Sequence, residues 1–195
     1  MTATPANADS GGTRCFLALL PAAACRDTLR RCRESFAGAT AGAAGCVRWL
    51  DTASLHLTLR FLGDASNAQV AYLKHMLPTL ARTLPVLEGH RYGIWPNRAR
   101  PRMLVLELAA PDALQALARQ CEALAHKAGF DPEPRAFKAH VTLARLRPGC
   151  AFGNLPPAPR ALVFESLGLI ASDLQTSGAR YRTLAGIALP AAEES

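Results

Sequence analysis

Residues 54–64 read Ser-Leu-His-Leu-Thr-Leu-Arg-Phe-Leu-Gly-Asp, and residues 137–145 read Phe-Lys-Ala-His-Val-Thr-Leu-Ala-Arg. In both stretches apolar residues alternate with polar ones, which is typical of a β-strand with one buried face. Because successive side chains of a strand point to opposite faces, His56 shares a face with Thr58, and His140 shares one with Thr142. The two stretches therefore predict two strands that each direct a His–Thr pair away from the core.

The segments around the two motifs repeat a similar order of expected elements. A strand, a helix and the first motif strand are followed by a helix for which Ser66 is a good N-cap. An extended stretch, a strand and a helix closed by Gly129 then precede the second motif strand. The expected strands are residues 15–20, 55–62, 84–95, 103–109, 139–146, 161–170 and 181–188, and the expected helices are 22–36, 66–77 and 111–129. This order predicts an α+β fold of two similar halves with a cleft between them.

The length and composition favour one compact domain. The chain has 195 residues, of which 50% are hydrophobic and only 19% are charged, so a sizeable core can be buried. Residues 1–13 are rich in small polar residues and predict a disordered lead-in. We expect residues 14–190 to form a single domain of two lobes and residues 191–195 to form a tail.

Charge and cysteine usage suggest where the protein works. Lys and Arg number 22 against 15 Asp and Glu, a formal net charge of +7, which favours anionic partners or simply solubility. No apolar run reaches the roughly 18 residues of a membrane span, and the N-terminus lacks the pattern of a signal peptide. We therefore expect a cytoplasmic monomer with no membrane contact. The six scattered cysteines are then expected to be reduced thiols, mostly in the core.

Two imidazoles on one cleft would suit acid–base chemistry at phosphorus. One neutral histidine can take a proton while the other, protonated, gives one to the leaving oxygen. Each threonine hydroxyl can donate to a non-bridging phosphoryl oxygen. No acidic residue next to either motif could hold a metal, so we expect no cofactor. The alternative is two ordinary strands with a polar face, but finding His-x-Thr-Leu twice by chance is on the order of one in a thousand.

These residues resemble the bacterial RNA 2′,3′-cyclic phosphodiesterases, also called 2′-5′ RNA ligases, of the two-histidine (2H) phosphoesterase superfamily. The resemblance spans roughly residues 14–189 and is carried by both motif regions and by shorter matches at Arg14–Leu19, Pro101–Leu104 and Gly178–Tyr181. One departure is Ala139, where a proline usually precedes the second histidine. The resemblance implies two pseudo-symmetric lobes with antiparallel sheets flanking a central cleft, and helices on the outside.

The resemblance also implies an activity and roles for the motif residues. The family opens the 2′,3′-cyclic phosphate of an RNA end to a 2′-phosphate. Carried over by position, His56 is the proton donor to the 3′ oxygen, His140 is the proton acceptor for water, and Thr58 and Thr142 hold the phosphate. Three alternatives stay open: 2′-5′ ligation in the reverse direction, hydrolysis of a small cyclic nucleotide, and a non-catalytic RNA-binding protein of the same fold.

Other side chains could contact the substrate. Arg60 shares the face of His56 if its strand is regular, and otherwise is a solvated charge. Strict alternation places Arg145 opposite to His140, unless a bulge reverses it. Phe137 could stack on a base or belong to the core. The basic loop that carries Arg98, Arg100 and Arg102 could contact an RNA backbone or merely be solvated.

Overall fold

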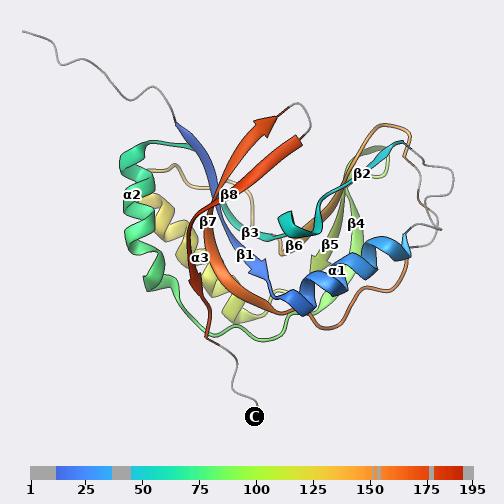
Figure 1. Ribbon diagram of the computed structural model, residues 1–195, viewed down its shortest axis with the longest axis horizontal. Helices are drawn as coiled ribbons and strands as arrows, with labels where there is room; N and C mark the ends of the chain where they lie inside the picture. The colour runs from blue at the N-terminus through green and yellow to red at the C-terminus, as the bar shows by residue number, and fades with distance from the viewer. Residues whose placement is uncertain (1–11, 37–44, 151, 153–154, 176–177, 191–195) are drawn as a thin grey trace, which may run out of the picture.

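The computed structural model describes residues 12–36, 45–150, 152, 155–175 and 178–190. Its strands form one antiparallel sheet in the order β4-β5-β6-β3-β1-β7-β8, with β2 paired to β6 (Figure 1). The strands are β1 (Thr13–Pro21), β2 (Val47–Trp49), β3 (Leu57–Ala65), β4 (Gly89–Asn97), β5 (Arg100–Leu108), β6 (His140–Leu146), β7 (Phe164–Gln175) and β8 (Gly178–Ala188). The helices are α1 (Ala23–Ser35), α2 (Asn67–Met76) and α3 (Asp112–Lys127), with the 3₁₀ turns η1 (Thr52–Ser54) and η2 (Leu77–Leu80).

The eight strands divide into two lobes. The first lobe contains β1, β3, β7 and β8, and the second contains β2, β4, β5 and β6; the two groups lie on opposite sides of Figure 1. The strands β3 and β6 join the lobes through the residue pair Leu57 and Val141. The predicted α+β class is confirmed, and the expected two antiparallel sheets are continuous with each other at this pair.

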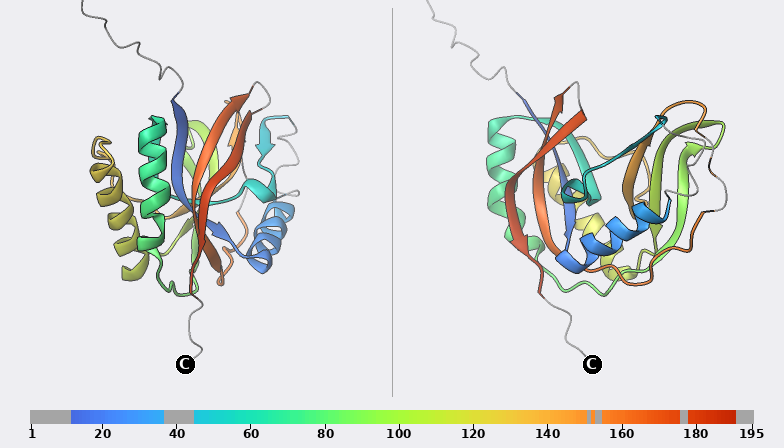
Figure 2. Two further views of the ribbon diagram at one scale, coloured as in Figure 1. Left: turned by 60° about the vertical axis from the view of Figure 1, so that its left-hand side comes forward. Right: turned by 45° about the vertical axis from the view of Figure 1, so that its right-hand side comes forward.

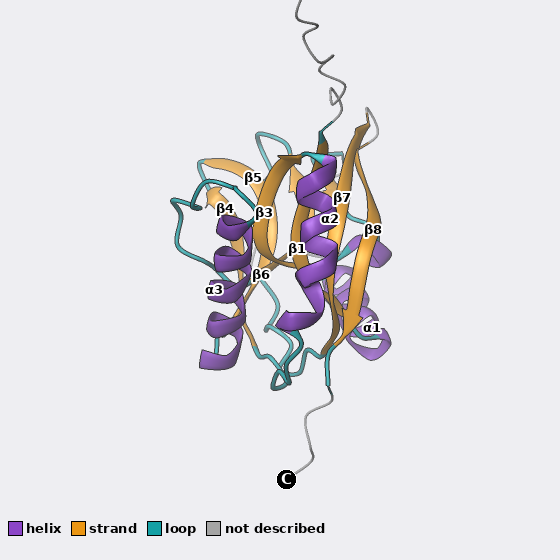
Figure 3. Ribbon diagram, turned by 90° about the vertical axis from the view of Figure 1, so that its left-hand side faces the viewer, coloured by secondary structure: helices purple, strands orange, loops and turns teal. Residues whose placement is uncertain are grey.

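Helices cover the outer face of each lobe. Helices α2 and α3 pack against each other, and α3 contacts β3 of the first lobe (Figure 3). Helix α1 lies at the opposite end of the molecule (Figure 2), where Phe36 at its end packs against Trp49 of β2 and Tyr92 of β4. The sheet face opposite to these helices carries both motif histidines, and we call it the histidine face.

Local signals placed the helices well. Ser66 caps α2 in a capping box, in which its side chain accepts from the backbone N–H of Gln69 and the Gln69 side chain accepts from the backbone N–H of Ser66. Gly129 follows α3 with a φ of 86°, a conformation that glycine adopts without strain. The motif leucines and valines Leu57, Leu59, Val141 and Leu143 are buried in the main core as expected.

The expectation about the cysteines is only partly met. Cys46 and Cys150 form a disulfide, with 5.6 Å between their Cα atoms, so the prediction of six reduced cysteines is wrong for this pair. They flank the paired strands β2 and β6, which brings residues 104 apart in sequence together. Burial raises the pKa of the thiols of Cys15 and Cys25 to about 11, as expected of core thiols.

The predicted basic loop at residues 96–102 is instead a tight hairpin. Strand β4 runs to Asn97 and β5 begins at Arg100, so only two residues turn between them. The predicted lead-in lies mostly outside the described residues, although β1 already begins at Thr13; the predicted tail at 191–195 lies wholly outside them. Among the described residues, no helix is long and apolar enough to cross a membrane.

Candidate active site

Both motif histidines are anchored in the same way. His56 directly precedes β3, and its Nδ1 lies 2.8 Å from the carbonyl oxygen of Ser54. His140 begins β6, and its Nδ1 lies 2.7 Å from the carbonyl oxygen of Lys138. A carbonyl oxygen can only accept, so each Nδ1 carries the hydrogen in the neutral ring. The Nε2 atom of each ring is therefore the one left to exchange protons with a substrate.

A β-bulge follows the threonine in each motif strand. In β3 the partner of Ala18 is Thr58, but the partner of the next residue of β1, Leu17, is Arg60. Leu59 is therefore an extra residue in β3. In β6 the partner of Val105 is Thr142, but the partner of Leu104 is Ala144. A bulge reverses the faces of the residues beyond it. The same distortion therefore recurs at the same place in both motifs.

The bulges decide which following side chains reach the histidine face. Phe61 pairs with Phe16 and joins the small apolar cluster on that face, packed against Phe16. Arg145 is exposed, and its charge lowers the pKa of both His56 and His140. The open question about Arg145 is thus resolved in favour of the bulge, which places it beside the histidines. Arg145 lies five residues after His140, and the residue five after His56 in the first motif is the aromatic Phe61.

Arg60 lies on the opposite face. It is only 7% exposed, it forms ion pairs with Glu122 of α3 and with Glu133, and it donates to the carbonyl oxygens of Phe61 and Asp131. The expectation that Arg60 shares the face of His56 is wrong, because the bulge turns it into the core. It cannot reach a phosphate held at the histidines.

Aromatic rings support both imidazoles. The ring of Phe16 stacks on His56, with 4.7 Å between centroids, and Tyr181 meets it edge-on at 5.1 Å. The ring of Trp95 packs on His140 at 4.5 Å. Each imidazole is thereby held in one orientation, which general acid–base catalysis requires.

Burial and neighbouring charges set the protonation of the two histidines. Burial lowers the pKa of His56; the hydrogen bond to Ser54 opposes this, and the charges of His140 and Arg145 lower it further. Burial also lowers the pKa of His140, partly opposed by the hydrogen bond to Lys138 and by the carboxylate of Glu107. Both pKa values lie below the ordinary value of about 6.5, so both rings are mostly neutral at pH 7 in the free protein.

The threonines complete the symmetry of the site. Thr58 and Thr142 are half-buried. Each lies two residues after its histidine and directly after the residue, Leu57 or Val141, that pairs β3 with β6. Their hydroxyls share the histidine face, where they are available to an anionic oxygen. The structure thus brings together five of the predicted residues, His56, His140, Thr58, Thr142 and Arg145.

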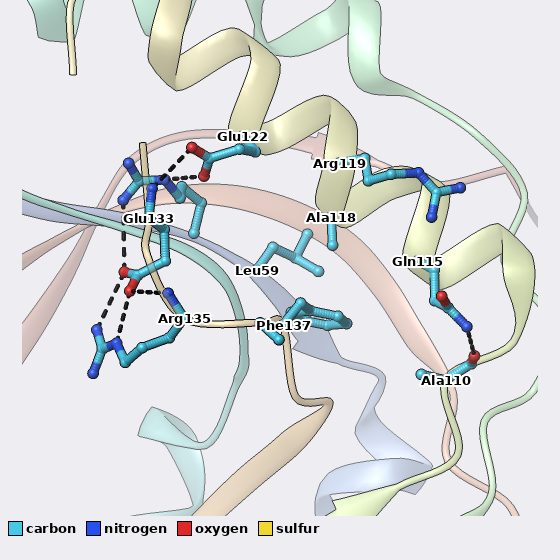
Figure 4. Close-up of a pocket in the computed structure, with 11 residues that line it drawn as sticks. Leu59, Ala110, Gln115, Ala118, Arg119, Glu122, Glu133, Arg135 and Phe137 are labelled. Atoms are coloured by element: carbon cyan, nitrogen blue, oxygen red, sulfur yellow. Dashed lines mark hydrogen bonds and ion pairs between the residues drawn. The ribbon is translucent and has the colours of Figure 1, made fainter. Parts of the chain in front are cut away.

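A pocket lies behind the first motif, on the side of the sheet that α3 covers. Its volume is about 510 Å³, with Leu59, Ala118 and Phe137 in its middle (Figure 4). The side chains of Glu122, Glu133 and Arg135 gather at one end, and Arg119 and Gln115 lie at the other. Phe137 packs against the main core here. Of the two alternatives for Phe137, the structure supports the position in the core, since its ring lines this pocket together with Leu59.

Residues that sequence reasoning missed surround the histidines. Phe16 and Tyr181 contact His56, Trp95 contacts His140, and the charge of Glu107 acts on His140. Glu107 did leave a signal, since it is the single charge inside the apolar run Met103–Leu108. Within the part of the chain that the structure describes, no three His, Cys, Asp or Glu side chains are grouped to hold a metal ion.

Comparison with known proteins agrees with this geometry. The family model of LigT-like phosphoesterases matches twice, over residues 19–105 and 106–181, and each match contains one His-x-Thr motif. A protein of Aeropyrum pernix named RNA 2′,3′-cyclic phosphodiesterase is 27% identical over 150 residues, 71% of this chain and 84% of that protein. One of the same name from Bacillus subtilis is 30% identical over 100 residues, 50% of this chain and 55% of that protein.

Solved structures show the same likeness in three dimensions. The apo crystal structure of LigT from E. coli superimposes with a TM-score of 0.71 at 25% identity, covering 92% of this chain and 99% of that one. LigT in complex with 3′-AMP gives a TM-score of 0.71 at 25% identity, covering 91% and 98%. The family match spans most of the chain and includes both motifs. This chain belongs to the family of LigT-like phosphoesterases.

Proposed function

We propose that this protein hydrolyses the 2′,3′-cyclic phosphate of RNA ends to a 2′-phosphate, with His56 and His140 as the acid–base pair. The observation that carries the proposal is the matched pair of imidazoles on one face, each held through Nδ1 by a backbone carbonyl and each followed by a threonine. The relatives named RNA 2′,3′-cyclic phosphodiesterase support this substrate. The LigT structure with 3′-AMP supports a nucleotide in the site.

The proposed reaction uses each side chain once. Nε2 of His140 takes a proton from water as the water oxygen forms a bond to phosphorus. The bond from phosphorus to the 3′ oxygen breaks, and Nε2–H of His56 gives its proton to that oxygen. The product is a 2′-phosphomonoester with a free 3′ hydroxyl. Thr58 and Thr142 donate to the non-bridging oxygens, and Arg145 offsets their negative charge.

The testing experiment uses a short oligoribonucleotide that ends in a 2′,3′-cyclic phosphate, with the protein in excess chelator. We expect a 2′-phosphate, identified by ³¹P NMR, because the 3′ oxygen is the leaving group. The chelator should not slow the reaction, because the proposed charge balance needs no metal ion. Formation of a 3′-phosphate would reverse the leaving group, and a requirement for added divalent metal would contradict the mechanism. Parallel reactions with 2′,3′-cyclic AMP and with an added 5′-hydroxyl RNA distinguish a small-molecule phosphodiesterase and a ligase.

The threonines should contribute to kcat. We expect Thr142→Val and Thr58→Val each to lower kcat about a hundredfold, because each removes a donor to an oxygen on which charge gathers in the transition state. Serine at either position should restore much of the rate, since it keeps the hydroxyl. Thr28→Val, on the exposed face of α1, is the matched control. Equal rates for Thr142→Val and the control would remove Thr142 from the mechanism.

The pH dependence follows from the lowered pKa values of the two histidines. The reaction needs one imidazole protonated and the other neutral, so kcat/KM should be bell-shaped, with its maximum midway between their pKa values in the free protein. Since both pKa values are lowered, the maximum should fall below about pH 6.5. Steady-state rates measured from about pH 5 to about pH 9 test this. A maximum well above neutral pH would contradict it.

A further inference from the structure

Glu107 occupies a position that faces one histidine only. It is the direct cross-strand partner of His140 in the pairing of β5 with β6. Residues paired in this way have neighbouring side chains on one face of the sheet. The Glu107 side chain is 19% exposed, and its two oxygens are held separately. Trp95 Nε1 donates to Oε1 at 2.8 Å, and Arg91 Nε donates to Oε2 at 2.7 Å.

The backbone of β4 is shaped to admit this arrangement. A Cβ atom at Gly93 would lie 2.5 Å from Glu107 Oε1 and 3.0 Å from Trp95 Nε1, closer than van der Waals contact allows. The absence of a side chain at Gly93 therefore lets the carboxylate and the indole lie across the strand. The indole that Glu107 holds is the one that packs on His140. Gly93, Trp95 and Glu107 thus form one unit behind His140.

The surroundings of His56 differ. Its ring contacts are Phe16 and Tyr181, and the charges that act on it are the positive ones of His140 and Arg145. A carboxylate favours a positively charged imidazole, whereas neighbouring cations disfavour one. The two halves of the site are therefore alike in shape and unlike in charge.

We propose that Glu107, oriented by Trp95, is a positioning residue that stabilises the imidazolium formed when His140 takes the proton from water. This inference rests on the proposed function and deepens it, because it gives a reason in this chain for His140 to be the base. No carboxylate of the described residues is among the groups that act on His56, so His56 gives up its proton more readily. Glu107 acts through His140 and does not itself touch the phosphate.

The charged groups around His140 are consistent with this role. Arg145 opposes the imidazolium, and Glu107 favours it. Lys138 reaches over the Trp95 ring, 5.8 Å from its centroid. Burial raises the pKa of the Glu107 carboxyl, but hydrogen bonds from Arg91 and Trp95 and the charges of Arg91 and His90 lower it on balance. The carboxylate is thus ionised at neutral pH and available to His140.

The test compares Glu107→Gln with Glu88→Gln. Both remove one negative charge, but Glu88 is exposed, precedes β4 and is not among the groups that act on His140. We expect Glu107→Gln to lower kcat about tenfold with KM changed less than about twofold. Whichever limb of the pH profile belongs to His140 should move to lower pH. Glu107→Asp, which keeps the charge, should recover part of the rate, and Glu88→Gln should behave as wild type.

A second variant displaces the carboxylate without removing any charge. In Gly93→Ala the new methyl group takes the place of Glu107 Oε1, the end of a flexible side chain, so the protein should fold with Glu107 moved away from Trp95. We expect its kcat and pH profile to change in the same direction as those of Glu107→Gln. Circular dichroism and thermal unfolding of each variant establish that it is folded.

NMR titration of the imidazole protons separates this inference from the proposed function, since it needs no substrate. We expect the pKa of His140 to fall in both Glu107→Gln and Gly93→Ala while that of His56 changes little. An unchanged His140 titration in folded Glu107→Gln would overturn the inference whatever the enzyme assays show. If the wild-type protein failed to hydrolyse cyclic phosphate, the proposed function would fall, and so would the assignment of Glu107 to a reacting base.

Discussion

Alanine in place of His140 or His56 should lower kcat on a 2′,3′-cyclic phosphate by at least about a thousandfold, within the range that a single general acid or base contributes. Each substitution removes the Nε2 atom that exchanges a proton with the reacting groups. The fold should survive, because both rings are only partly buried on the histidine face and lie outside the main core. Circular dichroism and equilibrium unfolding of each variant check this. His75→Ala and His126→Ala, on exposed helix positions, are the matched controls.

A modified substrate assigns the acid and the base separately. If sulfur replaces the bridging 3′ oxygen, the leaving group departs as a thiolate and needs no proton. We then expect His56→Ala to regain most of the wild-type rate on this substrate, while His140→Ala stays inactive because water must still be deprotonated. The opposite result would exchange the two roles. No rescue in either variant would show that the two histidines do not act as a simple acid and base.

Arg60→Ala should lower the free energy of unfolding by about 3 kcal/mol, more than any of the other variants. The guanidinium is buried and joins β3 to α3 and to the segment before β6, through Glu122, Glu133 and two backbone carbonyls. Removing it leaves these acceptors without their donor. The two glutamates are partly exposed, at 35% and 22%, so water offsets part of the loss. Urea unfolding measures the change.

Matched variants separate this role from a role in binding RNA. Arg119→Ala removes an arginine from the same pocket but from an exposed position on α3, and should leave stability within about 0.5 kcal/mol of wild type. Arg60→Lys keeps the charge but loses the planar fork, so its stability should be intermediate. The kcat of folded Arg60→Ala should equal that of wild type. A large rise in KM without loss of stability would contradict the burial of Arg60.

The pattern of alternation was sufficient for the start of each motif but failed beyond the threonines. His56 and Thr58, and His140 and Thr142, lie before the bulges, so the rule of two residues per repeat holds for them. Arg60 and Arg145 lie after the bulges, so their faces are reversed. A bulge depends on how a strand pairs with its neighbour, and the pairing of β3 with β1 or of β6 with β5 is not encoded within either strand.

Long-range contacts were likewise beyond the reach of local patterns. The disulfide between Cys46 and Cys150 joins residues 104 apart, and nothing in their flanking sequence distinguishes them from the four free cysteines. Phe137 is next to the second motif in sequence, yet it packs on the other side of the sheet, under α3. Proximity in sequence therefore did not decide the position of Phe137, and it gave no information about the pairing of the cysteines.

The sequence by itself determined the catalytic candidates, the α+β class and the caps of the helices, because these depend on the alternation of side chains and on hydrogen bonds between residues a few positions apart. Only the tertiary structure decided which charges face the histidines. The convergence of Glu107, Trp95 and Gly93 on His140, and the exclusion of Arg60, depend on strand register and on bulges. Register arises when distant strands pair, so the electrostatic difference between two nearly identical motifs appears only in the folded sheet.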